Sequence, residues 1–153
     1  MNVDSLVMFS SLDDFFSERT RNIQGCQEPT KAYITNVFRT TNANFAGESL
    51  TLIFAKASFE YKFETFQNLG DWLLFAKSVY PSSLNDASPE YYDALAQTSY
   101  YRCYRILDRK WVLFEELADT FPRLVRTLQP LMSPFENSAF EPGQFSSRRI
   151  IHT

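Results

Sequence analysis

Apolar residues recur at three- and four-residue spacing over most of the chain, which is the pattern of amphipathic helices. The pattern is clearest over 114–131, and its apolar stripe consists of Phe114, Leu117, Ala118, Phe121, Leu124, Val125, Leu128 and Leu131. Pro122 lies inside this stripe. Proline has no N–H and its ring crowds the preceding turn, so we expect a kink there.

Similar spacing predicts further helices before this one. Their expected ranges are about 11–23, from Pro29 to Phe38, about 48–58, 59–80 and 88–108. Pro81 ends the fourth of these, and Ser88-Pro89-Glu90 has the N-cap and first-turn residues that begin the fifth. We expect the helices over 59–80 and 88–108 to form an antiparallel pair.

The segment 48–58 is the ambiguous one, because "SLTLIFAKASF" alternates in part like a strand. We favour a helix, since the chain offers no second convincing strand to pair with it.

The resulting prediction is an all-α, antiparallel helical bundle of four to six helices with an extended C-terminal tail. The bundle domain spans 1–133 and the tail spans 134–153. The tail carries isolated phenylalanines, Phe135, Phe140 and Phe145, before Arg148 and Arg149. It either packs on the body or binds a partner, and we favour packing because exposed phenylalanine is costly in a monomer.

Composition narrows the classes of function. The chain has 153 residues, of which 44% are hydrophobic and 16% aromatic, enough for the core of one domain. A net charge of −3 and a pI of about 5.2 disfavour a nucleic-acid partner. The chain shows neither a signal peptide nor an apolar run of membrane-span length, so we expect a cytoplasmic protein and no membrane association. Cys26 and Cys103 are then expected to be reduced, although the sequence alone leaves a bridge between them open.

The residues that usually carry chemistry are sparse. The one histidine is His152, in the predicted tail, and the cysteines form no CxxC pair. Phosphate-binding glycine loops are absent. We therefore expect no metal, no cofactor and no catalytic residues.

Aromatic residues crowd the helix predicted over 88–108. They are Tyr91, Tyr92, Tyr100, Tyr101 and Tyr104, with Arg102 and Arg105 between them. Such a mixture can bind single-stranded nucleic acid, but helical geometry spreads these rings around the helix instead of forming one platform. A surface that contacts protein suits tyrosine and arginine better.

The stretch "LGDWLLFAKSVYP" over 69–81 places glycine and aspartate inside a predicted helix. Glycine in a helix interior costs about 1 kcal/mol relative to alanine, so we interpret Gly70 as a site of close helix packing. Its expected partners on the next helix are small: Ala96, Ser99 and Cys103.

The surroundings of Asp71 decide whether its carboxylate needs a polar partner. If a second layer of helices covers it, it needs an arginine, a tyrosine or a helix N-terminus beside it. We expect a ligand-binding or structural polar cluster of Asp71, Tyr92, Tyr100 and Arg102.

A set of residues spread over about 30–130 forms a further pattern: Leu69, Gly70, Asp71, Leu74, Phe75, Pro81, Ser83, Leu84, Tyr91, Tyr92, Tyr100, Phe114, Glu116, Leu117 and Ala118. In these residues the chain resembles a family of small bacterial all-helical proteins of unknown function. The chain departs from the family pattern at Ala96, Ser99 and Pro122. The resemblance implies a helical fold and a bacterial source, and it implies no activity.

Three functions fit these observations. The favoured one is a non-enzymatic protein-interaction module (an adaptor, regulator or complex subunit) whose partner and oligomeric state the sequence does not identify. The second is a small-ligand-binding or enzymatic bundle with its polar site around Asp71, Tyr92, Tyr100 and Arg102. The third, a nucleic-acid-associated protein, is disfavoured by the acidic pI.

Overall fold

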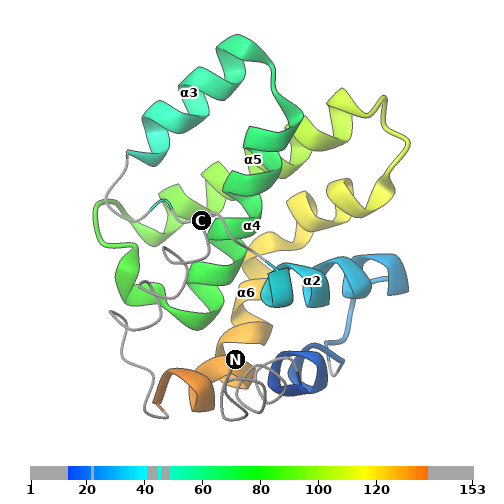
Figure 1. Cartoon of the computed structure of the whole chain (residues 1–153), viewed down its shortest axis with the longest axis vertical. Helices are drawn as coiled ribbons and strands as arrows, with labels where there is room; N and C mark the ends of the chain where they lie inside the picture. The colour runs from blue at the N-terminus through cyan, green and yellow to red at the C-terminus, as the bar shows by residue number, and fades with distance from the viewer. Residues whose placement is uncertain (1–13, 22, 41–44, 46–48, 138–153) are drawn as a thin grey trace, which may run out of the picture.

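The computed structural model of the chain describes residues 14–21, 23–40, 45 and 49–137, and these form helices and connecting loops without a strand (Figure 1). After a helical segment at 14–21 come α2(Glu28–Thr40), α3(Leu50–Glu60), α4(Phe63–Val79), the short 3₁₀ helix η1(Pro81–Ser83), α5(Pro89–Ile106) and α6(Val112–Asn137). The predicted all-α class is confirmed. Positions 11–13 of the first expected helix and residues 138–153 of the expected tail lie outside the described residues.

Helices α4 and α5 form the antiparallel pair that the sequence predicts. Three contacts set their register. The Cys103 thiol lies 3.9 Å from the carbonyl oxygen of Phe63, the Tyr100 ring lies against Gly70, and the Lys77 ammonium pairs with the Asp93 carboxylate. As the α5 position decreases, the α4 position increases, which is the signature of antiparallel neighbours.

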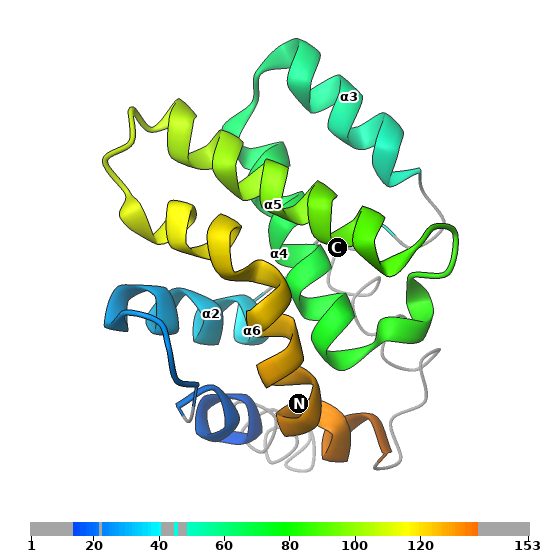
Figure 2. The ribbon, with the colours of Figure 1, turned by 180° about the vertical axis from the view of Figure 1, so that it is seen from behind.

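Helix α6 packs against both members of this pair. Gln97 of α5 donates to the carbonyl of Ala118 at 2.8 Å, and Gln129 of α6 donates to the carbonyl of Lys77 at 2.9 Å. Seen from behind, α6 changes direction in its middle part, as expected for a helix with an internal proline at position 122 (Figure 2). The helix continues to Asn137, four residues beyond the end of the bundle domain expected at 133.

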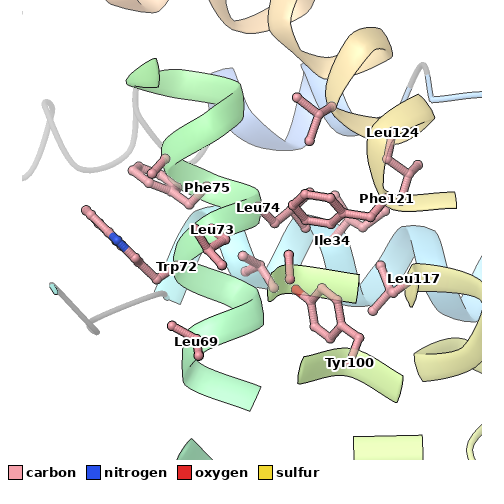
Figure 3. Packing of buried hydrophobic residues seen from close by; sticks show 14 of the residues in the cluster. Ile34, Leu69, Trp72, Leu73, Leu74, Phe75, Tyr100, Leu117, Phe121 and Leu124 are labelled. Atoms are coloured by element: carbon pink, nitrogen blue, oxygen red, sulfur yellow. The ribbon is translucent and has the colours of Figure 1, made fainter. Parts of the chain in front are cut away.

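The core surrounds α4. Phe66, Leu69, Leu73 and Leu74 are fully buried, and Trp72 and Phe75 lie on one side of the helix while Tyr100 and Phe121 lie on the other (Figure 3). Because several helices cover it, α4 is buried nearly all round between 72 and 79. This explains why Trp72–Ala76 is apolar on every face. Lys77 and Ser78 are the polar residues of the buried stretch.

The boundary between two predicted helices, 48–58 and 59–80, lies later in the structure. The expected helix over 59–80 begins only at Phe63, and Phe59 belongs to the end of α3 with 92% of its surface exposed. The break is a Schellman turn, in which Tyr61 is left-handed (φ 54°) and the N–H of Lys62 donates to the carbonyl of Ala57 at 3.3 Å. The choice of helix over strand for the preceding segment is confirmed, and its N-cap is Ser49, whose hydroxyl accepts from the N–H of Leu52.

Two further expectations concern membrane-spanning helices and the state of the two cysteines. Within the described ranges, no helix combines the length and apolarity needed to cross a lipid bilayer. Cys26 and Cys103 are both free thiols, with Cys103 buried in the core.

Candidate functional site

Two tyrosines from different helices converge on the carboxylate of Asp71. The Tyr33 hydroxyl of α2 lies 2.8 Å from Oδ1 and 3.0 Å from Oδ2, and the Tyr100 hydroxyl of α5 donates to Oδ1 at 2.8 Å. Gln67, one turn before Asp71 on α4, donates its Nε2 to the Tyr33 hydroxyl oxygen at 3.0 Å. The four residues make a connected polar chain from three helices.

This carboxylate is partly buried, and no basic residue of the described part of the chain forms an ion pair with it. Burial raises the pKa of Asp71 to about 7, against the opposing effect of the hydrogen bonds from Tyr33 and Tyr100. Burial, followed by the nearby Asp71 charge, also raises the pKa of both tyrosines. The tyrosines therefore stay protonated and act as donors, while Asp71 is the group that titrates near neutral pH.

The neighbouring glycine holds the Tyr100 ring. A Cβ placed on Gly70 would lie 2.8–3.0 Å from three ring carbons of Tyr100, closer than real Cβ contacts allow. Gly70 thus makes room for an aromatic ring from α5, and the same ring carries the hydroxyl that reaches Asp71.

The three small residues expected near Gly70 are all fully buried: Ala96, Ser99 and Cys103. The Ser99 hydroxyl is satisfied within its own helix by donating to the Leu95 carbonyl at 2.8 Å. Burial, together with the Asp71 charge, raises the pKa of the Cys103 thiol, so this cysteine is held in its unreactive form.

The structure brings together only two members of the expected cluster, Asp71 and Tyr100. Tyr92 lies two turns earlier on α5, where its hydroxyl accepts from the N–H of Asp86 at 3.0 Å. Arg102 is partly exposed on another face of α5 and makes no hydrogen bond to Asp71. Asp71 thus receives hydrogen bonds from the hydroxyls of two tyrosines, where an arginine was one of the expected partners.

An apolar hollow opens beside the polar chain. Its volume is about 300 Å³, and its lining consists of Tyr33, Phe63, Gln67, Leu107, Trp111, Leu113 and Phe114. We call it the Tyr33 hollow. The Phe114 ring packs edge-on against Tyr33, with centroids 5.4 Å apart, and also against Phe63 at 5.7 Å. The exposed lining is almost entirely aromatic and aliphatic, and Tyr33 and Gln67 are the lining residues that belong to the polar chain.

The tight turn between α5 and α6 builds one wall of this hollow. It is a second Schellman turn, in which the N–H of Arg109 donates to the Tyr104 carbonyl at 2.9 Å and that of Asp108 to the Arg105 carbonyl at 3.0 Å. Asp108 and Arg109 both have positive φ, 55° and 62°. The turn leads directly into Trp111, which lines the hollow and is 56% exposed.

Spacing within single helices could not reveal Tyr33, Gln67 and Trp111 as site residues. Tyr33 belongs to the apolar face of its own helix, and Trp111 lies between two helices. They become a site only because α2, α4 and the α5–α6 turn meet at one end of the bundle.

A second hollow, of about 570 Å³, lies at the opposite end of α5. Leu50, Trp72, Leu84, Tyr91 and Tyr92 are among its lining residues. This is where the structure places Tyr92. The Tyr91 hydroxyl is hydrogen-bonded to that of Thr51, which ties the start of α3 to the start of α5.

Metal-ligating side chains do not cluster in the described part of the chain, where no group of three or more His, Cys, Asp or Glu could hold an ion. The resemblance to small bacterial helical proteins stays a prediction. Comparison with protein-family models, with characterised proteins and with solved structures finds no match to this chain.

Proposed function

We propose that the chain is a non-enzymatic protein-interaction module of the bacterial cytoplasm. It binds a partner segment that inserts one apolar side chain, flanked by acidic residues, into the Tyr33 hollow. The observation that carries the proposal is the hollow itself, an aromatic-lined depression of about 300 Å³ that opens at the surface beside the half-exposed Trp111.

The exposed apolar surface around the hollow supports a protein partner. Trp111 and Val112 are 56% and 51% exposed, and they adjoin the lining residues Leu113 and Phe114. Aromatic side chains at the centre of a surface depression are the usual anchors of protein interfaces, because they bury a large area at a small cost in conformational entropy.

Charge indicates what flanks the inserted side chain. The stretch 102–111 carries four basic residues, Arg102, Arg105, Arg109 and Lys110, against one acidic residue, Asp108, in a chain whose net charge is −3. Arg105, Arg109 and Lys110 are exposed. Glu60, three residues before the lining residue Phe63, is paired with Lys62 at 2.9 Å. Acidic residues in the partner would be attracted to this end of the molecule.

A small-ligand site is the second candidate, favoured by the polar chain that begins at the hollow and ends at Asp71. A volume of about 300 Å³ is at the lower limit of small-molecule sites, which are also mostly apolar with a few polar atoms. The predicted polar site around Asp71 survives in this form with Tyr33 and Gln67 in place of Tyr92 and Arg102.

A displayed library of random peptides, selected on the full chain, tests the first candidate. We expect enriched peptides to share one aromatic or aliphatic residue between acidic residues. Trp111→Ala should weaken their binding by at least about tenfold, a loss of about 1.4 kcal/mol.

Leu52→Ala is the matched control, because Leu52 is also an exposed apolar residue, 71% accessible, but lies on α3 away from the hollow. Peptides that bind both variants equally well would contradict the proposal. Peptides without acidic residues would contradict the role of the basic stretch. Small molecules that displace the selected peptides only from a chain with intact Trp111 would support the second candidate.

A further inference from the structure

Helix α3 ends on an uncovered phenylalanine. Phe59 is 92% exposed, the largest exposed fraction among the large apolar residues that the structure describes. It lies two residues before Tyr61, whose left-handed backbone (φ 54°) closes the helix and fixes the direction in which the chain leaves it. Such a conformation costs a non-glycine residue about 1–2 kcal/mol. The fold therefore holds a large apolar side chain in water on a helix end of defined geometry.

The Tyr33 hollow lies close to this side chain and has the complementary character. Phe59 precedes the lining residue Phe63 by four positions, so their Cα atoms are at most about 14 Å apart. Both views place the end of α3 and the turn after α5 at the upper end of the molecule (Figures 1 and 2). The exposed lining of the hollow is almost entirely apolar, and its volume is about 300 Å³. A cavity of about 150 Å³ already holds benzene, so a phenyl ring fits.

We propose that the occupant of the Tyr33 hollow is Phe59 of a second copy of this chain, and that the two copies exchange these side chains reciprocally. Because Phe59 is exposed, it does not enter the hollow of its own copy. When a projecting side chain and its complementary hollow lie near each other, a twofold axis lets both copies make the same contact, and the assembly closes as a dimer. The inference rests on the proposed function in taking the hollow as the docking site, and it names the partner.

The exposed apolar surface around the hollow is large enough for such a dimer. Besides Phe59, three residues next to the hollow are about half exposed: Tyr61 at 52%, Trp111 at 56% and Val112 at 51%. An aromatic side chain carries on the order of 150–250 Å², so covering these residues on both copies removes roughly 1,000 Å² from water. This is near the lower limit for a specific interface, and we expect a weak dimer with a Kd of about 1–100 μM.

The charges beside Phe59 are compatible with this contact. The segment 56–64 contains two lysines and two glutamates, all exposed, so it carries no net charge when it meets the basic stretch 102–111. The exposed pair between Glu60 and Lys62 is of a kind that stabilises little, so Glu60 is able to pair with a basic residue of the second copy instead. Charge permits the contact, and the apolar side chains supply most of its free energy.

Self-association of the full chain tests the inference. Sedimentation velocity from about 1 μM to about 1 mM should show a monomer–dimer equilibrium without larger species. Phe59→Ala should weaken dimerisation about hundredfold, because each dimer loses two insertions and each buried aromatic anchor contributes about tenfold. Leu52→Ala is the matched control, because Leu52 is 71% exposed and lies two turns earlier on α3. It should dimerise like the wild type.

Mixing two variants tests the reciprocity. Leu113→Glu places a carboxylate in the lining of the hollow but keeps Phe59, and it lies in the first turn of α6, where an acid suits the helix dipole. Phe59→Ala has the opposite defect. A mixed dimer regains one insertion, so the mixture should associate about tenfold more tightly than either variant alone. Circular dichroism confirms that each variant is folded.

A chain that stays monomeric at about 1 mM, or a Phe59→Ala variant that dimerises as tightly as the wild type, overturns the inference. A mixture no tighter than its components, or growth beyond the dimer, overturns the reciprocal exchange. If the displayed peptides bind the hollow of a monomeric chain, the proposed function stands and only the second copy as partner is removed. If the chain dimerises through Phe59 but selects no peptide, the inference stands and a partner other than the chain itself is removed.

Discussion

At the scale of single residues, the adjacent residues Gly70 and Asp71 contact the same tyrosine in two different ways. Gly70 makes room for the ring of Tyr100, and Asp71 accepts the hydroxyl of the same side chain at 2.8 Å. The sequence predicted both parts in outline: close packing at the glycine and a tyrosine among the possible partners of the aspartate. It could not supply Tyr33, because nothing in the spacing of one helix says which residue of another lies opposite.

Gly70→Ala tests the close contact. The added methyl group would lie within 3.0 Å of the Tyr100 ring, so helix or ring must shift, at a cost of about 1–3 kcal/mol. Over most of that range the cost exceeds the gain of about 1 kcal/mol in helix propensity. We expect a lower melting temperature in thermal denaturation, whereas Asn68→Ala at an exposed position of the same helix should leave it unchanged or raise it. An equally stable Gly70→Ala variant would contradict the packing role.

Asp71 makes a specific prediction about pH. Its pKa is raised to about 7 in the folded chain, whereas an aspartate in the unfolded chain titrates near 4. Between these values the folded state holds a proton that the unfolded state has lost. The free energy of unfolding therefore falls as pH rises through this window, by up to about 1.4 kcal/mol per pH unit, and levels off above pH 7.

Asp71→Asn removes the titrating group and should remove this slope. Urea denaturation of both chains at several pH values between 4 and 8.5 measures it. The two stability curves should diverge between pH 4 and 7 and run parallel above. Parallel curves over the whole range would show that Asp71 titrates as it does in an unfolded chain.

At the scale of helices, the sequence predicted which helices exist better than it predicted where each one ends. Helix α5 began where Ser88, Pro89 and Glu90 indicated, because its cap is local chemistry that the sequence displays. The ends of α3 and α5 were harder, because a left-handed residue closes each helix and neither is glycine. Tyr61 and Asp108 occupy these positions instead. The predicted helix over 59–80 consequently ran through a real break.

The unusual residue at the end of α5 is open to a direct test. A left-handed conformation costs a non-glycine residue about 1–2 kcal/mol, and glycine adopts it without that cost. Asp108 has φ 55° and is exposed, so Asp108→Gly should raise the melting temperature, by an amount equivalent to about 1 kcal/mol.

Asp108→Ala is the control for this change. Alanine also lacks the carboxylate but retains the penalty of a Cβ in the left-handed region, so it should not stabilise the chain. Equal stabilisation by glycine and alanine would show that removal of the charge, and not the backbone, is responsible.

At the scale of the whole molecule, the charged residues are unevenly distributed, and basic residues gather beside the Tyr33 hollow. The net charge of −3 conceals a basic stretch at 102–111, and this stretch adjoins the Tyr33 hollow. The overall pI argues against a nucleic-acid partner, but it does not reveal this local excess of positive charge. The site arises because α2, the start of α4 and the α5–α6 turn meet, and that meeting is a property of the tertiary fold.

The charge distribution predicts how a selected acidic peptide should bind. The double substitution Arg105→Glu and Arg109→Glu should slow association by about tenfold at low salt, since both side chains are exposed and act at long range. Stopped-flow measurements at increasing ionic strength should show the difference shrinking. The same double change at Arg123 and Arg126, exposed on α6, is the control. An effect on dissociation alone would contradict electrostatic steering.

The contact between Gly70 and Tyr100 also limits how this protein can change. Two consecutive residues of α4 contact the Tyr100 side chain. Gly70 packs against its ring, and Asp71 accepts a hydrogen bond from its hydroxyl. A substitution at any of the three positions alters what the other two can accommodate, so their effects should be strongly non-additive. Single mutational steps away from this arrangement are therefore disfavoured, and a redesign that moves or removes the acid would have to replace all three residues together.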